Sequence, residues 1–307
     1  MRKMMRSGVV MIAALVMFAA VQTPSVAAQM RLGERLEYTF SFRGLVTGFA
    51  SIDIAHAVIA VAEETDSIQG REVYLTTLDL STAAFDMAEM LYPIRYSYRT
   101  WLEPGGQMPL LVNEYLETDE VSEELLWFDR DNLMGYRYVK QDDPPEQVDL
   151  PPDHLLAKLD RTEGDGSLLV RKNKLEISDG AVWDYLSMLF RLRYLELDSG
   201  AVFRLPLYNG KRIKEYRIEV VREPLKLGPD WRRPAFRLSL QEVRKGSATR
   251  SSVTRVWVSD DEERLPLRFY VERSIGVVEG ILQTGRPATS KDRGFSAATQ
   301  RSLDLIL

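Results

Sequence analysis

Four consecutive acids, Asp260, Asp261, Glu262 and Glu263, stand in the stretch WVSDDEERLPLRFYVE at residues 257–272. Clustered carboxylates can hold a metal ion or share the acid and base roles of a hydrolase. A calcium loop needs acids at alternate positions and a glycine at its bend, and this stretch has neither. The acids separate two apolar runs, the second with clean alternation, which indicates the exposed turn of a β-hairpin. We therefore interpret them as a solvated turn.

Other catalytic and metal-binding patterns are missing from the sequence. The chain has no cysteine and only two histidines, His56 and His154, which we expect at a strand end and at a helix N-terminus. No serine lies in a GxSxG turn, and neither the usual zinc ligands nor a glycine-rich phosphate loop is present. The sequence thus predicts no catalytic residue, no metal and no cofactor. A glycan hydrolase with paired carboxylates stays open, because such pairs follow no spacing rule.

Two groups of side chains suggest ligand binding. Aromatic residues recur on the predicted strands, where they could line a groove for a lipid or a glycan: Tyr38, Phe40, Phe42, Tyr96, Tyr98, Trp101, Trp127, Tyr136 and Tyr138. Basic residues gather in and after a predicted helix, where they could meet an anionic head group: Arg191, Arg193, Lys211, Arg212, Lys214, Arg217, Arg232 and Arg233. The alternatives are that the aromatic residues fill the core and that the basic residues form a solvated face. The candidate ligand-binding residues are Tyr38, Phe40, Tyr96, Tyr98, Trp101, Arg193 and Arg212.

The elements that would position these side chains are mostly strands. Strict alternation of apolar and polar residues dominates, as in LEYTFSF at residues 36–42. Turn signals at residues 104–106, 129–132 and 209–210 predict hairpins. About a dozen strands with few helices predict a mainly β fold, an antiparallel sheet curled into a barrel-like roll or sandwich.

One long helix is predicted near the middle of the chain, in SDGAVWDYLSMLFRLRYLELDSG at residues 178–200. Ser178 or Asp179 would cap it, and four apolar residues share one face at helical spacing: Val182, Leu186, Leu189 and Phe190. A short helix is expected between residues 81 and 92, where Pro93 ends it. We assign no regular structure to residues 154–174.

The N-terminus has the three parts of a signal peptide over residues 1–28. Arg2, Lys3 and Arg6 precede an apolar run at residues 8–21, and small residues follow. The run is shorter than the roughly 20 residues that cross a bilayer, so we expect cleavage near Ala27/Ala28 and a periplasmic or otherwise exported protein. No later stretch is long and apolar enough to predict a transmembrane helix.

The remaining chain divides by composition. We expect an N-terminal β half at residues 29–140, a Pro-rich and acidic connecting segment at 141–177, a helix with the C-terminal β half at 178–282, and a polar tail at 283–307. Removal of the three basic residues of the signal peptide takes the formal net charge from −5 to −8. That balance argues against a nucleic-acid partner, which requires a basic surface.

Three segments in this order carry a family resemblance: GERLEYTFSFRGLVTGFASI, WDYLSMLFRLRYLELDSGAVFRLPLYNGK and RVWVSDDEERLPLRFYVERSIGVVEGIL. Together they resemble the exported bacterial family called domain of unknown function 3108, over roughly residues 32–282. The resemblance implies a β-rich, curled sheet outside the cytoplasm and brings no catalytic residues. Residues 141–173 form a longer connection than the family pattern suggests, which leaves one barrel or two packed sheets open.

These observations favour a non-enzymatic binding or carrier protein of the cell envelope. Its ligand would be a lipid or a polysaccharide intermediate. The alternatives are a cell-wall glycan hydrolase with paired carboxylates and a structural adaptor that docks an envelope protein.

Overall fold

The protein is organised around one antiparallel sheet. The computed structural model describes residues 30–105, 108–142, 148–159, 168–177, 181–208, 211–227, 232–243 and 253–283. Its fifteen strands are β1 (Arg35–Gly44), β2 (Ile52–Val61), β3 (Asp66–Ile68), β4 (Arg71–Ser81), β5 (Arg95–Leu102), β6 (Pro109–Glu117), β7 (Val121–Asp129), β8 (Met134–Gln141), β9 (Leu168–Glu176), β10 (Val202–Tyr208), β11 (Ile213–Lys226), β12 (Arg232–Glu242), β13 (Val253–Ser259), β14 (Pro266–Arg273) and β15 (Gly276–Leu282). This exceeds the expected number of about a dozen, and the three-residue β3 and the edge strand β9 are among the strands that the sequence did not predict.

Four short helices interrupt the strands: the 3₁₀ turn η1 (Leu45–Thr47), α1 (Asp86–Leu91), α2 (Asp153–Leu156) and α3 (Tyr185–Arg193). The expected helix before Pro93 is α1. No helix within the described ranges has the length and apolar character needed to cross a bilayer.

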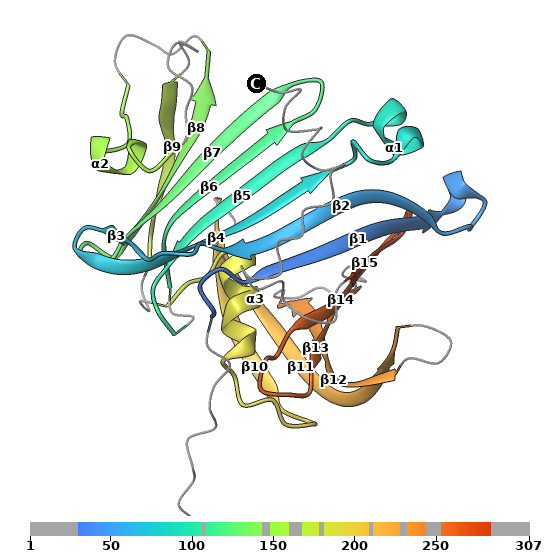
Figure 1. Cartoon of the computed structure of the whole chain (residues 1–307). Helices are drawn as coiled ribbons and strands as arrows, with labels where there is room; N and C mark the ends of the chain where they lie inside the picture. Colours follow the sequence, from blue (N-terminus) through green and yellow to red (C-terminus); the bar gives the residue numbers. More distant parts are fainter. Residues whose placement is uncertain are drawn as a thin grey trace, which may run out of the picture.

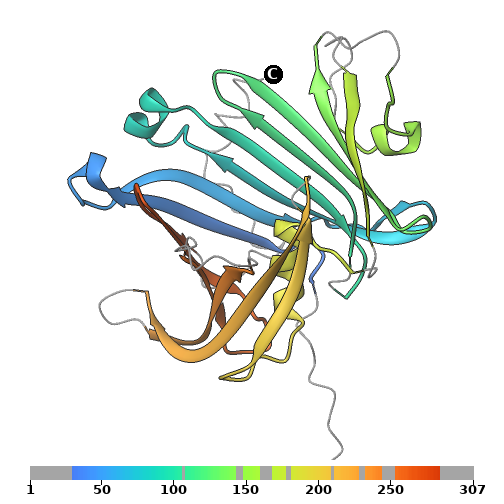
Figure 2. The same cartoon turned by 180° about the vertical axis from the view of Figure 1, so that it is seen from behind.

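The sheet runs in the order β10-β11-β12-β13-β14-β15-β1-β2-β4-β5-β6-β7-β8-β9, with β3 paired to β4. It curls strongly but does not close, and α3 lies between its two arms (Figures 1 and 2). This settles the question of one sheet or two in favour of a single continuous sheet. Where the arms approach, the ring of Phe128 meets that of Tyr208 edge to face at 5.7 Å, and the backbone of Trp183 pairs with β10.

The alternating pattern places apolar residues on both faces of this sheet. The inner face and α3 form the larger core, which includes Leu36, Tyr38 and Phe236. A smaller core on the outer face of β4–β9 contains Trp101 and Leu155 of α2. The connecting segment therefore contains α2 and the edge strand β9, where we had assigned no regular structure.

The start of α3 differs from the prediction. Asp184 caps the helix by accepting the N–H groups of Leu186 and Ser187, and the Ser187 hydroxyl accepts the N–H of Asp184 in return. Ser178 and Asp179 lie outside the described residues, and capping by either is wrong. The helix cannot begin earlier because the backbone of the preceding Trp183 is hydrogen-bonded to β10.

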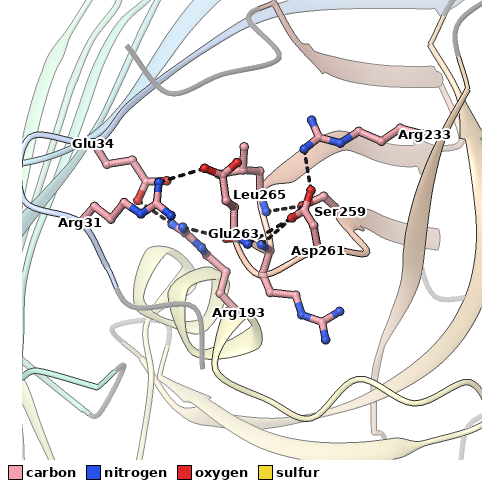
Figure 3. Close-up of polar contacts among 9 residues, drawn as sticks. Arg31, Glu34, Arg193, Arg233, Ser259, Asp261, Glu263 and Leu265 are labelled. Carbon is pink, nitrogen blue, oxygen red and sulfur yellow. Dashed lines mark hydrogen bonds and ion pairs between the residues drawn. The ribbon is translucent and has the colours of Figure 1, made fainter. Parts of the chain in front are cut away.

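A buried ion pair closes one end of the curled sheet (Figure 3). Arg193, in the last turn of α3, donates to Glu34 at 2.9 Å and to the carbonyl oxygen of Glu263 at 3.1 Å. The side chains of Arg193 and Glu34 are each 2 % exposed. Arg193 thereby fastens the helix to the start of β1 and to the β13–β14 turn.

The four acids at residues 260–263 occupy that turn, as predicted. Asp260 binds Arg222, and Asp261 accepts from Ser259, from Arg233 and from backbone N–H groups of the turn. Among the described residues, no group of three or more His, Asp or Glu side chains could hold a metal ion. These side-chain contacts show that Asp260 and Asp261 stabilise the turn.

The structure confirms the predicted place of one histidine and corrects that of the other. Several other predicted features lie outside the described residues. His154 lies in the first turn of α2, as expected. His56 does not end a strand but lies in the middle of β2, because alternation continues through it to Val61. The signal peptide, the turn at residues 209–210 and nearly all of the polar tail lie outside the described residues.

We expect Arg193→Met to lower the free energy of unfolding by about 3–5 kcal/mol, because it leaves the Glu34 carboxylate buried without its partner. The double variant Glu34→Leu/Arg193→Met should cost less than the sum of the two single variants. Urea denaturation measures all three. Arg31→Met is the matched control, since it breaks an exposed pair with Glu263 and should cost about 0.5 kcal/mol. Additive single effects would contradict this role for the pair.

Candidate ligand-binding site

The inner face of the sheet leaves a pocket beside α3. A nine-residue helix is about 14 Å long, whereas a ten-residue strand such as β1 extends for about 33 Å. The space beside the helix includes a pocket of about 280 Å³, just below the roughly 300–1,000 Å³ that small-molecule sites occupy.

Apolar and aromatic side chains line this pocket, and none of the described lining residues is charged. They come from both arms of the sheet and from one face of α3: Tyr38, Phe40, Ile59, Leu78, Tyr96, Tyr98, Tyr185, Leu186, Met188, Leu189, Leu192, Leu240, Thr254, Val256, Phe269 and Val271. Such a lining favours an apolar group over a charged one.

Three rings form one wall of the pocket. Tyr38 meets Phe269 edge to face at 5.2 Å, and Phe40 stacks on Phe269 at 6.3 Å. Gly280 of the neighbouring strand makes room for this arrangement, because a Cβ atom there would lie 2.6 Å from the ring of Phe40. On the opposite arm, Tyr96 and Tyr98 stack at 6.2 Å.

The hydroxyls of two lining tyrosines are bonded to groups of the protein. Tyr38 donates to the carbonyl oxygen of Pro266 at 2.8 Å, and burial raises the pKa of its phenol. Tyr96 donates to Glu114 Oε1 at 3.1 Å. A ligand in the pocket therefore meets the ring faces of these two residues more than their polar ends.

Carboxyl groups lie next to the pocket but outside its lining. Glu114 and Glu124 are register partners on β6 and β7, and Arg137 binds Glu124 through two nitrogens. Burial raises the pKa of Glu114, although the hydrogen bond from Tyr96 acts in the opposite direction. Burial also raises the pKa of Asp184, the α3 cap. Since Glu114 and Glu124 are neighbours on adjacent strands, they do not face each other across a cleft, as a paired-carboxylate hydrolase requires.

The pocket opens toward the end of the sheet that carries η1 and α1. Along β1, Tyr38 is fully buried, whereas Phe40, two residues nearer that end, is half-buried. The same gradient runs from Leu267 to Phe269 on β14. Tyr185, at the start of α3, is 52 % exposed. The opposite end is closed by the Arg193–Glu34 pair.

The structure brings four of the seven predicted ligand-binding residues around this pocket: Tyr38, Phe40, Tyr96 and Tyr98. Trp101 belongs to β5 as well, but it points to the outer face and lies in the smaller core. Arg193 is buried in its ion pair, and Arg212 is exposed near Glu242 at 3.9 Å. That the four pocket residues bind a ligand stays a prediction.

Several lining residues were not predicted from the sequence, notably Tyr185, Phe269 and Val271. Alternation in LPLRFYVE did indicate that Phe269 and Val271 share a face. It could not indicate that this face meets Phe40 of β1, because that contact depends on pairing of β1 with β15 across the whole chain.

We expect Glu114→Gln to change how stability depends on pH. Because folding raises the pKa of Glu114, the wild-type carboxyl favours the folded state below its ordinary pKa of 4.5 and loses that contribution as the pH rises. The free energy of unfolding of the Gln variant, minus that of wild type, should therefore increase from pH 4 to pH 7. Urea denaturation at each pH measures this difference. A difference that stays the same at every pH would contradict the raised pKa of Glu114 in the folded protein.

Comparison with known proteins assigns the chain to a family. A search of curated proteins finds no match. Among solved structures, the chain resembles a beta-barrel-like protein of domain of unknown function DUF1849 from Brucella abortus, with 9 % identity and a TM-score of 0.42 over 82 % of this chain and 97 % of that one. The profile of the family described as "Protein of unknown function (DUF3108)" matches residues 37–283. The chain belongs to this family.

Proposed function

We propose that this protein is a periplasmic, non-enzymatic carrier that binds an amphipathic ligand in its pocket and serves maintenance of the cell envelope. The observation that carries the proposal is the pocket of about 280 Å³, which is lined by apolar and aromatic side chains beside α3. Among the described lining residues only Thr254 and the tyrosines bear a polar group. Burial of an apolar chain there gains about 25 cal/mol per Å² removed from water.

The lining favours a lipid over a polysaccharide intermediate. A glycan needs several hydrogen-bonding partners for its hydroxyls, and the hydroxyls of Tyr38 and Tyr96 are engaged with protein groups. The ligand's polar end belongs at the mouth, near the exposed Tyr185. Arg193 does not support the expected contact with an anionic head group, since its guanidinium is bound to Glu34.

The proposed export rests on the signal-peptide pattern of residues 1–28. Met30 is buried, and its N–H donates to the hydroxyl of Tyr194 at 2.7 Å. The fold therefore includes residues that directly follow the proposed cleavage site near Ala27/Ala28. A chain without cysteine requires no disulfide chemistry in that compartment.

Native mass spectrometry of the mature protein from periplasm, with an organic extract of the same sample, tests the carrier function. We expect a stoichiometric added mass that extracts as a lipid. Val271→Trp places a large ring in the pocket and should abolish that mass. Val277→Trp is the matched control: Val277 pairs with Glu272, next to Val271, and so lies on the opposite face. It should retain the ligand.

Other outcomes distinguish the alternatives. A clean apo mass, together with no binding of a fluorescent fatty acid, would contradict the carrier function and turn attention to a structural adaptor. An added mass that extracts as a glycan and is shortened during incubation would favour the hydrolase. Retention of the ligand by Val271→Trp would place the binding site elsewhere.

A further inference from the structure

Large apolar side chains are exposed on three connections around the mouth of the pocket. They belong to the β1–β2 connection, to α1 with the residue after it, and to the β14–β15 turn: Leu45, Phe49, Met87, Met90, Leu91, Tyr92 and Ile275. We call this set the mouth rim. Leu45, Met90 and Ile275 are 76 %, 78 % and 72 % exposed. An accumulation of this kind marks an interaction surface, whereas scattered apolar residues do not.

The three connections are neighbours in space. Gly44, just before η1, pairs with Gly276, the first residue of β15 after the β14–β15 turn, and α1 contacts β2. Both views show η1, α1 and the β14–β15 turn at the same end of the strands (Figures 1 and 2). The pocket opens toward this same end, so the mouth rim borders the route by which a ligand enters and leaves.

Phe49 is held in an unfavourable backbone conformation. Its φ angle is 64°, a value that glycine or asparagine adopts easily and that is a genuine outlier for a bulky residue. Its side chain is nevertheless 68 % exposed, so it contributes little to the packing of the protein. Together with its place beside the mouth of the pocket, this exposure suits a contact outside the folded chain.

We infer that the mouth rim docks on a lipid bilayer and inserts its apolar tips among the acyl chains. The inference rests on the proposed function, because a lipid that left the pocket at this end would otherwise have to cross water. Separate tips around an opening suit a fluid bilayer, in which each side chain inserts independently. The charges beside the rim are mixed, with Arg43 and Arg273 exposed together with Asp53 and Asp86, so apolar contacts rather than head-group charge carry the binding.

Flotation with vesicles of phosphatidylcholine and phosphatidylglycerol tests the inference on the full mature protein. We expect wild type to float with the vesicles, with little loss when salt is raised. Phe49→Asn should weaken binding about tenfold, because one large apolar side chain no longer enters the bilayer. Its urea midpoint should be unchanged or higher, because asparagine tolerates positive φ. Met90→Gln on α1 should weaken binding similarly.

Leu133→Asn is the matched control. Leu133 also has a positive φ, 53°, and is 45 % exposed, but it lies in the β7–β8 turn at the closed end of the sheet. It should bind vesicles like wild type. Failure of wild type to float, or equal binding by all variants, would overturn the inference. If wild type does not float but self-associates, and Phe49→Asn abolishes that self-association, the mouth rim is instead an interface between copies of this chain.

The two proposals can fail separately. Val271→Trp blocks the pocket without touching the mouth rim, so it should still float with vesicles while it loses its ligand. Wild type that retains a lipid in native mass spectrometry but does not float would overturn only the docking. Wild type that floats without ever holding a lipid would overturn only the carrier function.

Discussion

The ion pair between Arg193 and Glu34 is the constraint on which the interior depends. Two charges this deeply buried are tolerated only where each finds its partner in good geometry. The last turn of α3 must therefore lie beside the start of β1 and the β13–β14 turn. This fixes the position of the helix inside the curled sheet and leaves the pocket of about 280 Å³ beside it. A charge that we first considered for ligand binding thus shapes the site without touching it.

The acid-rich turn at residues 260–263 contributes to the same end. Asp261 ties Ser259, Arg233 and the turn backbone together, so the carbonyl oxygen of Glu263 is held where Arg193 reaches it. At the closed end, Asp261 and Arg193 therefore bind groups of the turn and of the start of β1, whereas the mouth exposes the large apolar side chains of the mouth rim. The two ends of the sheet therefore differ: the end at the Arg193–Glu34 pair is closed, and the end at η1 and α1 is open.

The local pattern of apolar, polar and turn-forming residues predicted much of this fold. Alternation identified most strands, the acids at residues 260–263 lie in a turn as predicted, and Tyr38, Phe40, Tyr96 and Tyr98 lie around one pocket. Long-range pairing could not be predicted in the same way. Nothing near Arg193 in the sequence indicates that Glu34, 159 residues away, would bury it. Trp101 follows Tyr98 closely, yet a strand turns odd and even residues to opposite faces. The cap at Asp184 was missed because the backbone of Trp183 is hydrogen-bonded to β10.

The sheet ends at β9 and β10 without joining them. A closed barrel has a diameter set by its strand number and stagger, but here the two arms meet through contacts such as that of Phe128 with Tyr208. The arms can separate slightly while every ladder between neighbouring strands stays intact. The width of the interior is therefore set by side-chain packing between the arms and not by a closed hydrogen-bonded ladder. The proposed ligand would therefore be enclosed by side-chain packing that spans the two arms, and not by a ladder of fixed circumference.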